Sequence, residues 1–128
     1  MQGADKHECE AAKAAALAEL RAASSEARGH VLSIFAALGS EPERVLRAEA
    51  AHLSPGEARK LVIAAALSRQ AWALVLDEPT NHLDLPSIER LEAALSAYPG
   101  CVVLVTHDEA FAKNVTARSL RVEGGRVT

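Results

Sequence analysis

Hydrophobic positions follow two different patterns in the two halves of the chain. The first half favours helices alone: an Ala-, Glu- and Arg-rich stretch over 5–28 without proline, a short apolar helix over 31–38 that Gly39 ends, and another helix from Pro42. Large apolar side chains are sparse in the first of these helices, so we expect it either to pack its alanine face against a neighbour or to fray in water. We therefore predict a helical subdomain over residues 1–52.

From residue 53 onward, predicted helices alternate with apolar runs of strand length, which favours an α/β fold with parallel strands covered by helices. The expected elements are a helix over 55–70, a strand over 73–77, a helix from Pro86 to a break at Pro99-Gly100, and a strand over 101–105. The second strand is apolar throughout, which is typical of a strand buried on both faces. Short stretches of alternating apolar and polar residues on either side of Gly124-Gly125 predict a closing β-hairpin over 119–128. We predict a second subdomain over 53–128.

Composition narrows the function classes. The 128 residues suit about one domain, and with 49% hydrophobic but only 3% aromatic residues the core must be aliphatic. The net charge of −3 comes with no basic stripe, so we expect no direct nucleic-acid binding by this chain. No apolar run approaches the length of a membrane span, and Met1 is followed by polar residues, so we expect a soluble, cytoplasmic protein with reduced cysteines.

Polar side chains follow both predicted strands where each strand ends. Asp77 and Glu78 come directly after the first strand, and Thr106-His107-Asp108 follows the second. The carboxyl ends of parallel strands meet at one edge of a sheet, so these groups should face one crevice. Asp77 is suited to hold Mg²⁺ through water, Glu78 to orient or deprotonate an attacking water, and His107 to donate to a phosphate. For any one residue an ordinary polar strand end is the simpler interpretation, whereas the combination favours nucleotide hydrolysis.

A turn upstream of the first strand has a structural interpretation and a functional one. Ser54 as N-cap, Pro55 at the first helical position and Glu57 three residues after Ser54 form a capping box. The hydroxyl and the free N–H groups at such a helix start also suit a phosphate. However, none of the seven glycines is followed by Lys and then Ser or Thr, so the loop that cradles phosphates is missing. The sequence carries half of a catalytic apparatus.

These motifs together resemble the C-terminal part of an ATP-binding cassette (ABC) ATPase. The resemblance rests on Leu53–Glu57, on the run Leu74–Asp84, and on Val105–Asp108. Asn81-His82-Leu83-Asp84 and Tyr98-Pro99-Gly100 are most similar to the ABC-F group, soluble tandem-cassette proteins of translation and ribosome protection. The match covers 53–128 well and 24–52 loosely. It implies a partial P-loop NTPase fold.

The resemblance also implies roles, cofactors and partners. The cofactors would be ATP and Mg²⁺, and the partners a second cassette or a homodimer partner, with the ribosome reached through a longer parent protein. The implied site residues are Ser54, Gly56 and Glu57 in the signature motif that contacts ATP of the opposing cassette, Asp77 as the Walker B acid that holds Mg²⁺ through water, Glu78 as the catalytic carboxylate, Asn81, His82 and Asp84 in the D-loop between cassettes, and His107 as the switch histidine.

Two departures from the family pattern leave three hypotheses. Pro55 stands where the family has Gly and removes one N–H donor, and the Walker A loop is absent. The first hypothesis is an ATPase fragment that is inactive alone and works when another segment supplies Walker A. The second is a non-hydrolytic dimerisation or regulatory module. The third, one lobe of a split ATPase like those of chromosome maintenance, ranks lower because no apolar heptad persists. Whether the parent edits translation or confers antibiotic resistance by ribosome protection stays open.

Overall fold

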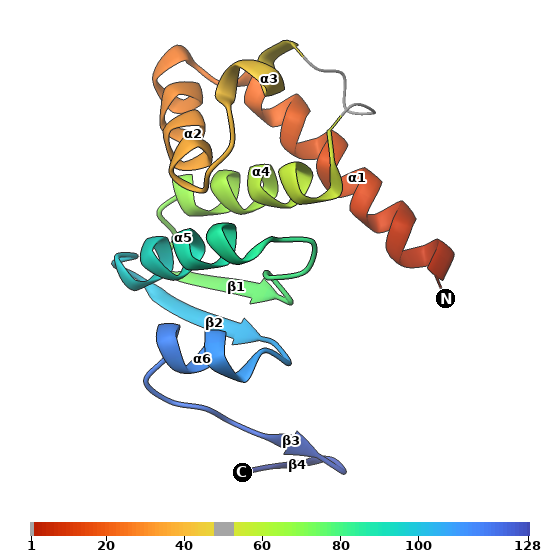
Figure 1. The fold of residues 1–128 in the computed structure, drawn as a ribbon, viewed down its shortest axis with the longest axis vertical. Helices are drawn as coiled ribbons and strands as arrows, with labels where there is room; N and C mark the ends of the chain where they lie inside the picture. The colour runs from red at the N-terminus through yellow and green to blue at the C-terminus, as the bar shows by residue number, and fades with distance from the viewer. Residues whose placement is uncertain (1, 48–52) are drawn as a thin grey trace.

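The computed structural model of the chain describes residues 2–47 and 53–128, and it is a mixed α/β structure. Figure 1 shows α1 to α4 gathered at one end, β1 and β2 below them with α5 and α6, and the β3–β4 hairpin at the other end. In chain order the elements are α1 (Gln2–Ala22), α2 (Ser25–Ala37), α3 (Pro42–Arg47), α4 (Pro55–Ser68), β1 (Ala73–Asp77), α5 (Leu85–Ser96), β2 (Cys101–Val105), α6 (Glu109–Val115), β3 (Val122–Glu123) and β4 (Arg126–Val127).

The helix predicted over 5–28 is wrong in its extent, because the chain breaks between α1 and α2. Ser24 is the N-cap of α2, and its Oγ accepts a hydrogen bond from the Ala27 amide at 3.2 Å. Arg28 closes the end of α1 by donating to the backbone carbonyls of Leu20 and Ala23, each at 3.1 Å. The apolar stretch predicted as a separate helix over 31–38 is therefore the second half of α2.

Helix α4 packs against both α1 and α2 and forms the centre of the helical end. Its buried residues Leu61 and Ala64 share one hydrophobic core with Leu17 of α1 and Phe35 of α2. Of the alanines of α1 whose burial is described, only Ala16 is buried, and it lies beside Leu17 and near Leu20, so the helix packs through its leucines rather than through the expected alanine face. The division into subdomains at residue 53 stays a prediction. No helix in the described part of the chain is both long and apolar enough to cross a membrane.

Strands β1 and β2 pair in parallel, with Ala73 opposite Cys101 and Asp77 opposite Val105. One face of this sheet belongs to the core, where Leu74 and Leu76 are buried. The other face is open: Val75 is 67% exposed and Val103 46% exposed. The prediction that the second strand is buried on both faces is therefore wrong, because within the described residues only one face of the sheet is packed against the core.

The predicted β-hairpin is confirmed at the C-terminal end. Val122 pairs with Val127 and Glu123 with Arg126 in antiparallel register. Gly124 and Gly125 make the two-residue turn with φ values of 54° and 76°, a conformation that glycine adopts without steric cost. Figure 1 shows this hairpin at the opposite end of the molecule from the α1–α4 helices.

Candidate active site

The two acidic residues lie at the carboxyl end of β1. Asp77 is the last residue of the strand and is exposed. Glu78 leaves the strand with φ 44°, a conformation that is uncommon for a residue with a side chain, and its amide donates to the Val105 carbonyl at 2.7 Å. This backbone bond continues the pairing of the two strands by one residue. It fixes the start of the turn relative to the end of β2.

Glu78 and His107 lie together, as the parallel strand ends predict. The Glu78 Oε1 accepts a hydrogen bond from the His107 backbone amide at 3.1 Å and lies 3.6 Å from His107 Nε2. The imidazole is 100% exposed, whereas the Glu78 side chain is 24% exposed. Among the described residues the Asp77 carboxylate has no hydrogen bond or ion pair with the protein. The structure thus places the Glu78 carboxylate beside a solvent-facing imidazole, and Asp77, one residue earlier, exposes a free carboxylate.

Arg59 is a residue of this site that the sequence did not reveal. Its Nη2 donates to the backbone carbonyl of Asp77 at 3.0 Å and also to that of Glu78. Its Nε is buried and, within the described residues, has no hydrogen-bond partner. The contact joins α4 to the acidic turn across 18 positions of sequence, so no local pattern signals it.

The segment predicted as the signature motif starts α4 through a side-chain cap. Ser54 is the N-cap, its Oγ accepts from the Glu57 amide at 3.1 Å, and Pro55 follows as the first helical residue. The Glu57 carboxylate lies 3.4 Å from Arg44 Nη1 of α3. The predicted capping box is therefore confirmed in its serine half, and the Glu57 carboxylate has an ion-pair partner on another helix.

The segment predicted as the D-loop lies directly against the signature segment. A Cβ built on Gly56 would stand 2.8 Å from the His82 carbonyl oxygen, which is closer than side chains approach in practice. His82 has φ 66°, so this turn contains a second residue in the left-handed region. Asp84 ends the turn as N-cap of α5, where its Oδ1 accepts from the Ser87 amide at 3.0 Å. The hydrogen bonds from Ser87 lower the pKa of Asp84 below 3.8.

A groove of about 590 Å³ runs beside this contact. Residues of both segments and of α3 line it, among them Ser54, Gly56, Glu57, Lys60, His82 and Asp84. Asp77, Glu78 and His107 do not line it. The structure therefore divides the predicted site residues into two groups, one around Glu78 and His107 at the strand ends and one around the groove.

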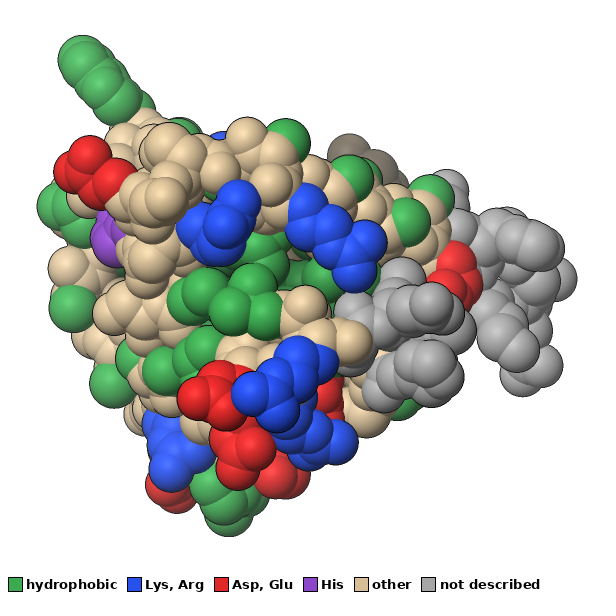
Figure 2. All heavy atoms as spheres, turned by 90° about the horizontal axis from the view of Figure 1, so that it is seen from above, with side chains coloured by type: hydrophobic (Ala, Val, Ile, Leu, Met, Phe, Trp, Pro, Cys, Tyr) green, Lys and Arg blue, Asp and Glu red, His purple; other side chains and the backbone are tan. Residues whose placement is uncertain are grey.

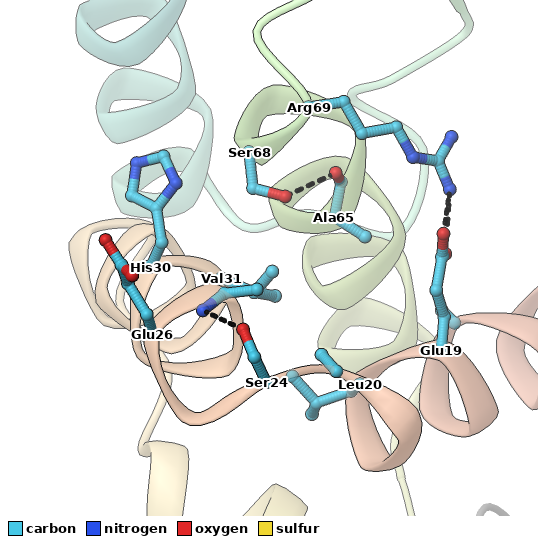
Figure 3. Close-up of a pocket in the computed structure, with 12 residues that line it drawn as sticks. Glu19, Leu20, Ser24, Glu26, His30, Val31, Ala65, Ser68 and Arg69 are labelled. Atoms are coloured by element: carbon cyan, nitrogen blue, oxygen red, sulfur yellow. Dashed lines mark hydrogen bonds and ion pairs between the residues drawn. The ribbon is translucent and has the colours of Figure 1, made fainter.

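A second hollow, of about 480 Å³, lies among α1, α2 and α4 and contains none of the predicted site residues (Figure 3). Ala16, Ala27 and Ala65 are among the residues that line it. The Arg69 guanidinium and the Glu19 carboxylate form an ion pair at its rim, with a shortest contact of 2.7 Å. On the face shown in Figure 2, Lys and Arg side chains are separated or lie beside acidic ones and form no continuous basic stripe.

The carboxylates fit Mg²⁺ bound with a nucleotide better than a metal held by protein alone. Among the described residues, no group of three His, Cys, Asp or Glu side chains has the geometry of a metal site. Mg²⁺ prefers oxygen ligands, keeps several waters, and commonly takes one or two carboxylates beside substrate phosphates. Asp77 offers one exposed carboxylate at the strand end, which suits that arrangement.

Parallel strands that end in an acidic pair and a histidine, together with a capped turn at the start of α4, are the arrangement that the resemblance to an ATP-binding cassette ATPase predicts. The family model described as "ABC transporter" matches residues 5–81, more than half of the chain. The chain therefore belongs to the ABC transporter family and forms part of its ATPase domain.

The relatives of this chain include ABC-F proteins. The ribosome protection protein VmlR of Bacillus subtilis is 38% identical over 108 residues, which is 80% of this chain and 18% of VmlR. Elongation factor 3A of Saccharomyces cerevisiae is 42% identical over 91 residues, 71% of this chain and 9% of that protein. ABC transporter F family member 5 of Arabidopsis thaliana is 47% identical over 73 residues, 57% of this chain and 10% of that protein. The chain spans less than a fifth of the length of each.

Proposed function

We propose that this chain supplies the signature motif, the acidic pair and the switch histidine of an ABC-F-like ATPase. It hydrolyses ATP when a segment that carries a phosphate-binding loop completes the site. The contact between the Glu78 carboxylate and His107 carries this proposal, because it joins the ends of two strands that the sequence marks with catalytic residue types. Alone, the chain has no main anchor for the nucleotide phosphates.

The geometry suits each residue to a separate task. The Glu78 carboxylate accepts from the His107 amide, at 3.1 Å to Oε1 and 3.5 Å to Oε2, and it orients or deprotonates the attacking water. The exposed His107 imidazole donates to the γ-phosphate and stabilises the charge that develops there. Asp77 holds Mg²⁺ through water, and the ion supplies charge neutralisation on the phosphates when it is bound.

The groove group serves a second nucleotide. Ser54 and Gly56 contact the γ-phosphate of ATP held by an opposing cassette, with Glu57 in the same motif, and Pro55 weakens this contact because it offers no N–H. Asn81, His82 and Asp84 are all exposed, as residues at a contact between cassettes must be before assembly. The partner is a second cassette or a second copy of the same chain.

The wider role follows from the relatives. One is named a ribosome protection protein and another an elongation factor, so we place the parent of this chain in cytoplasmic translation, with antibiotic resistance through ribosome protection as one form of that role. Contact with the ribosome then comes through other parts of the parent. The mixed surface charge of this chain supports no direct nucleic-acid contact of its own.

The experiment that tests the proposal uses VmlR in which this chain replaces the matching segment. We expect the chimera to hydrolyse Mg-ATP, and Glu78→Gln to reduce kcat by about 100-fold or more, since removing a general base typically costs at least that much. Glu89→Gln is the matched control, because Glu89 is an exposed residue of α5 and takes no part in the hydrogen bonds and ion pair between Glu78 and His107. Unchanged turnover in the Glu78→Gln chimera would contradict the catalytic role.

A second candidate function is a non-hydrolytic module that occupies a partner cassette through the signature and D-loop surface. The observation that favours it is Pro55, which removes a phosphate donor at the groove. This candidate predicts that Glu78→Gln leaves turnover unchanged while His82→Ala weakens association with the partner, measured by sedimentation.

A further inference from the structure

One face of α4 touches both ends of the acidic turn. Gly56 lies against the carbonyl of His82, and Arg59, three residues further along the helix, donates to the carbonyls of Asp77 and Glu78. Residues three apart lie on the same side of a helix. The helix that begins with the signature motif therefore contacts the backbone of the turn at its start and near its end.

The turn between these contacts has a backbone that needs support. Glu78 and His82 both have positive φ values, 44° and 66°, although neither is glycine. Such conformations persist when surrounding interactions fix them. The Glu78 amide is held by the Val105 carbonyl, and the Arg59 guanidinium holds the carbonyl on the other side of the same residue. Hydrogen bonds from a charged donor are stronger than neutral ones.

We propose that Arg59 is a positioning residue that couples the signature helix to the catalytic carboxylate. This inference rests on the proposed function of Glu78. The guanidinium fixes the peptide groups of Asp77 and Glu78, and this keeps the Glu78 carboxylate at the His107 amide. A shift of α4 when the signature motif meets a phosphate then moves the guanidinium and, with it, the backbone that carries the catalytic carboxylate.

The chemistry of the side chain separates positioning from packing. Arg59→Met keeps an apolar stem of similar length and removes every donor. Arg59→Lys keeps a cationic donor that can reach a carbonyl, but without the planar fork of the guanidinium. If the stem alone matters, the two variants behave alike. If the hydrogen bonds to the carbonyls matter, lysine restores part of what methionine loses.

The first measurement uses the full 128-residue chain and amide NMR. We expect Arg59→Met to speed hydrogen exchange of the Glu78 amide by about 10-fold or more, because the turn opens locally, and to shift the His107 amide signal. The exchange rate of the Glu78 amide in Arg59→Lys should lie between those of the wild type and Arg59→Met. Arg69→Met is the matched control, because Arg69 lies at the other end of α4 and its guanidinium bonds to Glu19. Equal exchange in the Arg59→Met and wild-type chains, or the same change in Arg69→Met, overturns the proposal.

The second measurement uses the VmlR chimera and separates kcat from KM. We expect Arg59→Met to lower kcat by about 10-fold or more with KM for ATP within about 2-fold, since misplacing a catalytic group slows chemistry while the nucleotide anchor lies elsewhere. Partial recovery in Arg59→Lys supports positioning. Loss of turnover with Glu78→Gln but full kcat with Arg59→Met overturns the role of Arg59 alone. Turnover that withstands Glu78→Gln overturns the proposed function, and with it any catalytic meaning of Arg59.

Discussion

The close approach of Gly56, in the first turn of α4, to the backbone of His82 leads to a sharp prediction for Gly56→Ala. An added Cβ would stand 2.8 Å from the His82 carbonyl oxygen, so about 0.6 Å of movement is needed to reach ordinary contact at 3.4 Å. The obstructing atom belongs to the backbone of His82. The turn that contains His82 is closed by the Leu83 amide, which donates to the Thr80 carbonyl at 3.1 Å. The neighbour therefore cannot give way by rotating a side chain.

Two effects of opposite sign determine how much Gly56→Ala changes the free energy of unfolding. Alanine is favoured over glycine inside a helix by about 1 kcal/mol, and less in a first turn such as this one. Overpacking against a fixed neighbour typically costs about 1–3 kcal/mol. We expect the cost to exceed the gain, so Gly56→Ala lowers the free energy of unfolding by about 1–2 kcal/mol.

Gly29→Ala is the matched control for this prediction. Gly29 lies inside α2, and a Cβ there would meet nothing within 4 Å. Only the propensity gain remains, so this variant should be about 0.5–1 kcal/mol more stable than the wild type. In urea, where unfolding free energies of small proteins fall by about 1–3 kcal/mol per molar, the midpoints of the two variants should differ by on the order of 1 M. Equal upward shifts of both midpoints would show that the D-loop backbone does not lie against Gly56.

Two further predictions concern the elements that flank the site. The hydrogen bonds from Ser87 lower the pKa of Asp84, so the ionised Asp84 carboxylate stabilises the fold above pH 3.8, and this stabilisation is lost as the pH falls through the lowered pKa. The urea midpoint of Asp84→Ala should therefore fall below that of the wild type by more at pH 7 than at pH 2.5. An equal difference at the two pH values would contradict the lowered pKa. Phe111→Ala removes a side chain that is 1% exposed in the packing of α6, so the unfolding free energy should fall by about 3–5 kcal/mol, whereas a loss below about 1 kcal/mol would show that α6 is not docked.

Local signals in the sequence predicted much of the fold. The strands over 73–77 and 101–105 have the predicted bounds because each is a short apolar run between turn residues. Ser54 with Pro55 located the start of α4 because a capping serine before proline has few alternatives. The break at Ser24 was missed because the flanking Ala, Glu and Arg residues favour helix on both sides.

Local sequence signals could not predict features that depend on contacts between helices and strands. The open face of β2 follows from how much of the sheet is covered, which the apolar run itself does not encode. For the site, the meeting of Glu78 with His107 was predictable because parallel strands end at one edge. Arg59 was not, because its hydrogen bonds to the carbonyls of Asp77 and Glu78 arise only when α4 lies beside β1.

Isothermal titration of Mg-ATP into the isolated chain tests most directly whether it carries only part of an ATP site. The VmlR chimera, in which we expect the remaining VmlR segments to supply the phosphate-binding loop, serves as the positive control. We predict micromolar affinity for the chimera and no saturable binding tighter than about 1 mM for the chain alone, because backbone N–H groups and the lysine of the phosphate-binding loop provide the main anchor for the nucleotide. Micromolar binding by the isolated chain would contradict the proposal that another segment must complete the site.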